Sequence, residues 1–110
     1  MRGGMGNMGN MQQMMKQAQM MQEKMLKAQD ELKDRTVEAS AGGGAVTVVA
    51  NGAKQILSVK IEKELASSGD ADMLQDLILA AVNEALNKAS EMTETEMKKI
   101  TGGMGMPGLF

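Results

Sequence analysis

The chain has 110 residues, 43% of them hydrophobic, and a formal net charge of −2. Its length predicts one domain, and the lack of cysteine and histidine excludes disulfides, thiolate nucleophiles and imidazole acid–base catalysis. Phe110 is the only aromatic residue, which disfavours recognition of single strands by base stacking. No segment has the pattern of a membrane span or a secretory signal. We therefore expect a cytoplasmic protein that is not an enzyme and uses no cofactor, metal, membrane or small-molecule substrate.

Residues 1–10 are rich in Gly, Met and Asn and are expected to form a disordered tail. Asn10 is a candidate N-cap for a helix from about Met11 to Asp34. In that helix, apolar residues recur at alternating spacings of three and four, the period of a coiled-coil seam. The seam positions are Met11, Met14, Ala18, Met21, Met25, Ala28 and Leu32. Glu31 would form an ion pair with Arg35 if the helix reached that far.

Alternating patterns after the first helix predict three short strands, at residues 36–41, 45–50 and 55–61. Gly42-Gly43-Gly44 supplies a first turn that tolerates positive φ. Asn51-Gly52 is a strong signal for a second hairpin. In the third strand, the residues expected to face inward are Leu57, Val59 and Ile61. The segment therefore predicts a three-stranded antiparallel meander.

Residues 62–69 are expected to be a connection, and Asp70 is a candidate N-cap for a second helix from about Ala71 to Ile100. Residues 102–110 are expected to be a flexible C-terminal tail. The order of elements predicts an α+β fold of long helix, three-stranded antiparallel meander and long helix. Residues 11–101 would form its single domain.

The two predicted helices are longer than the sheet between them. At 1.5 Å per residue they would span roughly 36 and 45 Å, whereas a short strand spans roughly 20 Å. The sheet cannot cover either helix from end to end, so part of each apolar stripe must meet another surface. We therefore predict an oligomer with projecting helical arms.

The lysines of the two helices admit more than one interpretation. Such residues commonly do no more than solvate a helix face. Doubled in a symmetric dimer, they could instead contact phosphates of duplex DNA with a salt-dependent affinity. The Met-rich helix and the Gly/Met tails also suit a peptide-binding or chaperone-like adaptor without a nucleic-acid role. A structural coiled-coil adaptor is a third possibility.

Four segments carry a resemblance to a known family. They are MQQMMKQAQMMQEKM, TVEASAGGGAVTVVANGAKQILSVKI, MLQDLILAAVNEALNKA and KKITGGMGMPGLF. On these motifs, nearly the whole chain resembles the YbaB/EbfC family of nucleoid-associated proteins. The resemblance implies a tweezer-like homodimer with centrally associated sheets and projecting helices, located at the nucleoid. It also implies binding of duplex DNA, with effects on DNA conformation, nucleoid organisation and gene expression. The DNA-contacting surface of the family corresponds here to Lys16, Lys24, Lys27, Lys88, Lys98 and Lys99.

Overall fold

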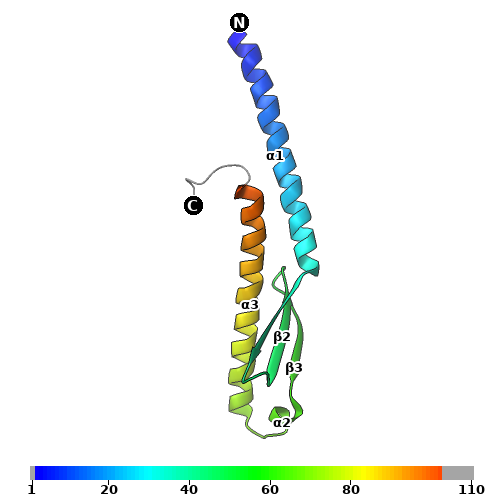
Figure 1. Cartoon of the computed structure of the whole chain (residues 1–110), viewed down its shortest axis with the longest axis vertical. Helices are drawn as coiled ribbons and strands as arrows, with labels where there is room; N and C mark the ends of the chain where they lie inside the picture. The colour runs from blue at the N-terminus through cyan, green and yellow to red at the C-terminus, as the bar shows by residue number, and fades with distance from the viewer. Residues whose placement is uncertain (1, 103–110) are drawn as a thin grey trace.

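The chain is an elongated molecule of 81 × 25 × 16 Å in which one helix extends far beyond the rest (Figure 1). A computed structural model describes the backbone of residues 2–102 and the side chains of residues 9–102. The elements in chain order are α1 (Arg2–Asp34), β1 (Thr36–Ala41), β2 (Val46–Asn51), β3 (Ile56–Ile61), α2 (Lys63–Ala66) and α3 (Ala71–Gly102). This order confirms the predicted α+β fold, to which the structure adds the short helix α2.

The three strands form an antiparallel sheet in the order β1-β2-β3, as the meander prediction requires. The glycine turn joins β1 to β2, and Gly42, Gly43 and Gly44 all take positive φ values, which glycine adopts without a steric cost. Ala39 lies opposite Val48 in the ladder. Residues directly opposite each other share a face of the sheet, so this face combines the apolar residues of β1 and β2.

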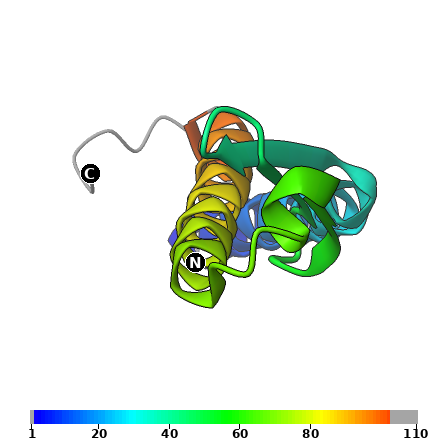
Figure 2. The same cartoon turned by 90° about the horizontal axis from the view of Figure 1, so that it is seen from below.

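Helix α3 packs on that face through small side chains. Ala81, Ala85 and Ala89 recur every four residues, so they lie on one side of the helix, and all three are fully buried. They meet Val46 and Val48, which are also fully buried. Viewed end-on, α3 lies to one side of the strands (Figure 2). Because alanine projects so little, the helix and the sheet approach closely and form a thin core.

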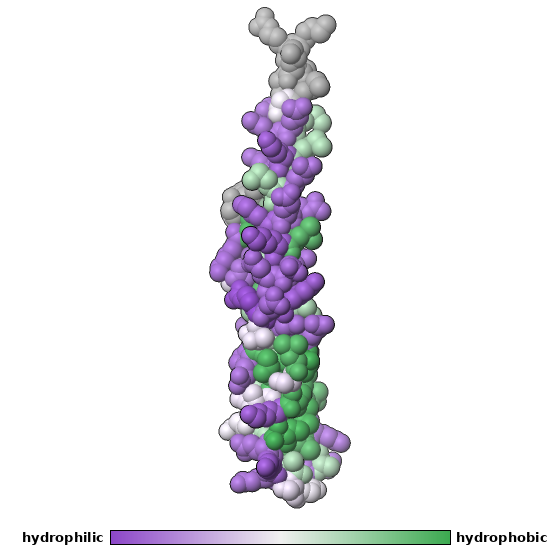
Figure 3. Space-filling view, turned by 90° about the vertical axis from the view of Figure 1, so that its right-hand side faces the viewer, coloured by the Kyte–Doolittle hydropathy of each residue, from purple (hydrophilic) through white to green (hydrophobic). Residues whose placement is uncertain are grey.

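Helix α3 covers strand β3 less than it covers β1 and β2. Val59 is paired with Val48 and therefore shares the α3-facing side of the sheet, yet Leu57 and Val59 are 53% and 43% exposed. The inward prediction therefore holds for Ile61, which is half-buried and packs against the core. For Val59 it holds for the face of the sheet but not for burial within one chain, and Leu57 lies at a register shift and has no partner in the ladder. With Ile56, Leu57 and Val59 form an exposed surface that we call the β3 patch. Figure 3 shows a continuous hydrophobic area on this side of the molecule.

Helix α1 begins at Arg2 rather than at Met11, so residues 2–10, expected to be a disordered tail, are helical. Asn10 therefore lies inside the helix and not at its N-cap. These residues contain no proline that would block the helix, although each glycine costs about 1 kcal/mol relative to alanine. From residue 103 on, the predicted C-terminal tail lies outside the described residues.

Neither long helix contains a stretch that is long and apolar enough to cross a membrane, within the part of the chain that the structure describes.

The turn between β2 and β3 follows the predicted Asn51-Gly52 hairpin but is longer than two residues. The Oδ1 atom of Asn51 accepts hydrogen bonds from the backbone N–H groups of Ala53 and Gln55, both at 3.0 Å. Lys54, and not Gly52, takes the positive φ of 61°. The side chain of Asn51 therefore stabilises a turn in which the backbone N–H and C=O of Gly52 are free to make other contacts.

The backbone N–H of Gly52 holds the end of α1 by hydrogen bonds. It donates to the carbonyl oxygens of Leu32 at 2.9 Å and of Arg35 at 3.2 Å. The carbonyl of Gly52 accepts a hydrogen bond from Thr93 Oγ1 of α3 at 3.1 Å. Leu32 is 2% exposed and is the only buried side chain among residues 9–34 of α1. We call these contacts, together with the ion pair between Arg35 and Glu96, the α1 anchor.

Replacing Gly52 with alanine is expected to destabilise the fold. A Cβ at this position would lie 2.7 Å from the Cβ of Leu32 and still closer to its carbonyl oxygen, so backbone must move. Overpacking of this kind typically costs about 1–3 kcal/mol, which urea unfolding would measure. Gly9→Ala is the control, because a Cβ there meets nothing within 4 Å and favours the helix. Equal urea midpoints for Gly52→Ala and the unmodified chain would contradict the role given to this contact.

Candidate nucleic-acid interface

The C-terminal half of α1 lies beside the end of α3 and antiparallel to it, and the N-terminal half of α1 extends further (Figure 1). We call residues 9–34 and 92–102 together the arm. Along α1, Met21, Met25 and Ala28 are half-buried and Leu32 is buried, all of them at predicted seam positions. The heptad spacing therefore identified the face of α1 that packs in this half of the helix.

The predicted contact residues of α1 all lie on the surface of the arm. Lys16, Lys24 and Lys27 are exposed. At 3.6 residues per turn, Lys16 and Lys27 lie roughly opposite the seam, and Lys24 lies nearer one flank. Within residues 9–102, none of the three makes a hydrogen bond or an ion pair with another side chain. They are therefore available to an anionic partner.

The lysines of α3 divide into two groups. The Nζ of Lys88 donates to the backbone carbonyl of Glu38 in β1 at 2.9 Å, so this lysine sits at the sheet and not on the arm. Lys98 and Lys99 are exposed near the end of α3, and the Nζ of Lys99 lies 3.3 Å from Glu96 Oε1. The structure therefore places five of the six predicted residues on the arm and engages Lys88 elsewhere.

The ion pair of the anchor fixes how the two helices of the arm align. Glu96 and Arg35 lie at one level, and α1 and α3 run upward from it in opposite chain directions. At 1.5 Å per residue, Lys27 and Lys98 then lie within about 10 Å of each other along the arm axis. Lys16 lies about 16 Å further toward the free end of α1. The cationic groups therefore follow the length of the arm rather than forming one cluster.

Acidic residues share this surface. Residues 9–34 contain four lysines and four acidic residues, and Glu94 is exposed on the α3 part of the arm. The arm is therefore a surface of mixed sign, whose attraction for any polyanion is weakened by its own carboxylates and by salt.

Glu96 is the one acidic group of the arm that is held by two cations. Its Oε1 atom lies 2.8 Å from Arg35 Nη1 and 3.3 Å from Lys99 Nζ. The hydrogen bond from Arg35, and then that from Lys99, hold the pKa of the Glu96 carboxyl below its usual value of 4.5. The predicted pairing of Arg35 with Glu31 is replaced by this contact, because α1 ends at Asp34. Arg35 and Glu96 are 61 positions apart, so no local spacing in the sequence could have predicted this ion pair.

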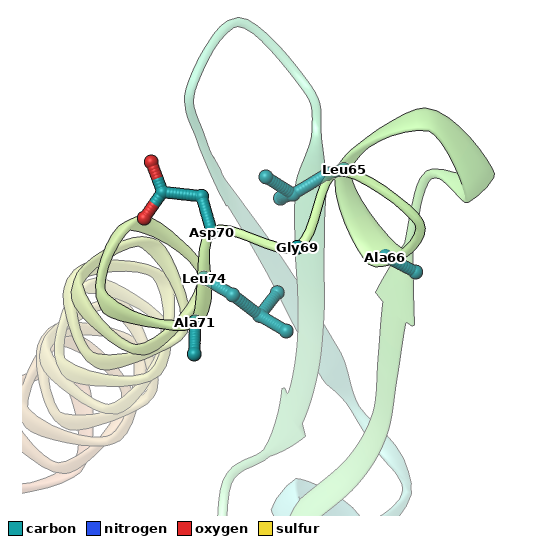
Figure 4. A pocket seen from close by; sticks show the side chains of 6 residues that line it. All are labelled: Leu65, Ala66, Gly69, Asp70, Ala71 and Leu74. Carbon is teal, nitrogen blue, oxygen red and sulfur yellow. The ribbon is translucent and has the colours of Figure 1, made fainter.

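A small cavity lies at the opposite end of the molecule, between α2 and the start of α3 (Figure 4). Its volume is about 150 Å³, and its walls are Leu65, Ala66, Gly69, Asp70, Ala71 and Leu74. The Asp70 carboxylate accepts a hydrogen bond from the Met73 N–H at 3.0 Å, which confirms it as the N-cap of α3. Figure 4 shows this carboxylate turned away from the leucine side chains that line the cavity. The cavity is small and most of the side chains around it are leucine and alanine, so the arm is the stronger candidate site.

Comparison with known proteins identifies relatives of the whole chain. The model of a family described as the YbaB/EbfC DNA-binding family matches residues 8–104. A nucleoid-associated protein of Clostridium novyi is 58% identical over 107 residues, 97% of this chain and 94% of that protein. One of Acetivibrio thermocellus is 61% identical over 103 residues, 93% of this chain and 91% of that protein. The crystal structure of an uncharacterized Helicobacter pylori protein shares the fold, with a TM-score of 0.61 and 22% identity over 71% of this chain and 90% of that one.

The lowered pKa of Glu96 predicts how the stability of the anchor depends on pH. A carboxyl whose pKa is lower in the folded state adds stability above its unfolded pKa, and this stability is lost as the pH falls through the folded pKa. Glu96→Gln should therefore lower the urea midpoint at pH 7 and lose much of that effect below pH 4.5. Glu94→Gln, which removes a nearby exposed carboxylate, is the control. A Glu96→Gln effect of equal size at pH 7 and pH 3 would exclude a contribution from the charge.

Proposed function

This chain belongs to the YbaB/EbfC DNA-binding family of nucleoid-associated proteins, and on that premise we propose that it binds duplex DNA as a homodimer through the lysines of its arm. The observation that carries the proposal is the match of the family model over residues 8–104, which includes the arm and the sheet. We propose in addition that binding alters DNA conformation, and through it nucleoid organisation and gene expression, in the cytoplasm.

The arm suits contact with the DNA backbone better than reading of bases. Its exposed cations are lysines, which act as point charges toward phosphates and lack the planar fork that reads guanine. They are spread along a narrow rod, so they can follow a strand of regularly spaced phosphates. We therefore assign the DNA contact to Lys16, Lys24, Lys27, Lys98 and Lys99, and leave Lys88 at the sheet.

The β3 patch supports a homodimer. Strand β3 is at the edge of the sheet, and its Leu57 and Val59 remain exposed in a single chain. An apolar surface of this kind on an edge strand ordinarily marks a site of association. A second copy brings the same surface, and a two-fold axis lets each patch cover the other. Each dimer then presents two arms to one DNA duplex.

Replacing a lysine of the arm is expected to weaken the salt dependence of DNA binding. If Lys27 of each copy neutralises one phosphate, Lys27→Gln should reduce the slope of log K against log salt by about 1.8 per dimer. Fluorescence anisotropy with a labelled duplex, titrated at several salt concentrations, measures this slope. Lys63→Gln is the matched control, since Lys63 is an exposed lysine of α2, at the far end of the molecule from the arm.

Two results would overturn the assignment of the DNA contact to the arm. One is an affinity for duplex DNA that does not depend on salt. The other is an equal loss of slope in Lys27→Gln and Lys63→Gln, because that would mean that only the total charge matters.

Placing a charge in the β3 patch is expected to separate the dimer. Leu57→Asp would bury a carboxylate without a partner, so it should shift the mass in sedimentation equilibrium from twice 11.7 kDa toward 11.7 kDa. Ser58→Asp adds the same charge one residue further on, on the opposite face of the strand, and should leave the dimer intact. A single-chain mass for the unmodified protein at micromolar concentration would exclude this interface.

A further inference from the structure

The seam of α1 continues beyond the end of the helix that covers it. From Met21 to Leu32 the seam residues are half-buried or buried, because α3 lies against them. Further toward the N-terminus, Ala18 is exposed, and Met14 and Met11 are 67% and 60% exposed. The spacing of three and four is unbroken across this change. One continuous stripe is therefore packed in one half and open in the other, and we call the open half (Met11, Met14, Met15 and Ala18) the tip seam.

The charge pattern around the tip seam is unusual for an exposed helix. Residues 9–22 contain a single charged residue, Lys16, and the rest are Met, Gln, Ala, Asn and Gly. Lys16 lies roughly opposite the seam, at 3.6 residues per turn. The residues that flank the seam, Met15, Gln17 and Gln22, are uncharged. A second helix can therefore approach this side without meeting a charge of either sign.

We propose that the tip seam pairs with the tip seam of another copy, antiparallel, and so joins molecules through the free ends of their arms. The heptad period favours a helical occupant, because a helix places side chains into successive seam positions. Continuity with the α1–α3 packing supports this, because the occupant takes the place that α3 holds lower on the same stripe. An antiparallel arrangement sets the two sheets at opposite ends, where they do not collide.

The composition of the tip seam favours a copy of itself over another protein. Two uncharged flanks do not repel each other, whereas selection of a different helix usually relies on charges beside the seam. Methionine adapts its shape to an identical neighbour. The stripe is short, so each contact is weak and depends on concentration. This self-contact is separate from the β3 patch, and Lys16 remains exposed on the outer side of the pair.

Sedimentation velocity of the full chain from micromolar to millimolar concentration tests the pairing. We expect species larger than the β3 dimer to grow with concentration in the unmodified chain. Met14→Glu should weaken this growth tenfold or more, because it brings unpaired charges into the seam, while the β3 dimer remains. Gln19→Glu adds the same charge on the outer side of α1 and should change nothing. Absence of larger species at millimolar concentration, or equal loss in both variants, would overturn the proposal.

Cross-linking gives a readout that does not depend on the β3 dimer. The chain contains no cysteine, so Met14→Cys and Gln19→Cys each introduce a single thiol for a short bis-maleimide. We expect cross-linked chains to form at least ten times faster with Met14→Cys. The same ratio is expected when each is combined with Leu57→Asp, which removes the β3 contact. Equal rates at the two positions would contradict tip pairing, and would leave the DNA-binding and homodimer proposals unaffected.

Discussion

The arrangement of the arm depends on the hydrogen bonds made by the backbone N–H and C=O of Gly52. Its N–H holds the last turn of α1 through Leu32, and its carbonyl holds α3 through Thr93. No other α1 side chain in the range 9–34 is buried, so hydrophobic burial alone gives the helix little support. The orientation of α1 relative to the sheet must therefore be set by these hydrogen bonds and by the neighbouring ion pair of Arg35 and Glu96. A side chain at position 52 would separate the surfaces that the bonds join.

The small residues of the core explain why the chain has an open side. Alanines 81, 85 and 89 let α3 lie close to β1 and β2, and the helix then covers little of the third strand. Core residues of this size also bury little apolar area each. Covering the β3 patch with a second copy would therefore supply apolar burial that one chain lacks. The same choice of side chains that makes the core thin would make the proposed association favourable.

The sequence predicted periodic features well and contacts between distant segments poorly. Strand β1, the glycine turn and the packed half of the α1 seam followed from local spacing, because each depends on neighbours within a few residues. The start of α1 was wrong, since composition suggested disorder where the structure continues the helix. Among the candidate site residues, the lysines of α1 are exposed, as expected for residues that lie outside the apolar heptad seam. The bond from Lys88 to Glu38 had no local signal, because it depends on how closely α3 packs on β1.

A net charge of −2 is a poor guide to a molecule this long. Asp70, Asp72 and Asp76 lie in or beside the first turns of α3, and about 40 Å of helix separates Asp72 from Lys98 at 1.5 Å per residue. Exposed charges are screened over about 8 Å at physiological ionic strength. The charges of the acidic end are therefore screened at the distance of the arm. On the arm itself, lysines and carboxylates are nearly balanced in number. A phosphate near the arm meets whichever lysine is closest, so the position of each lysine matters more than the sum over the chain.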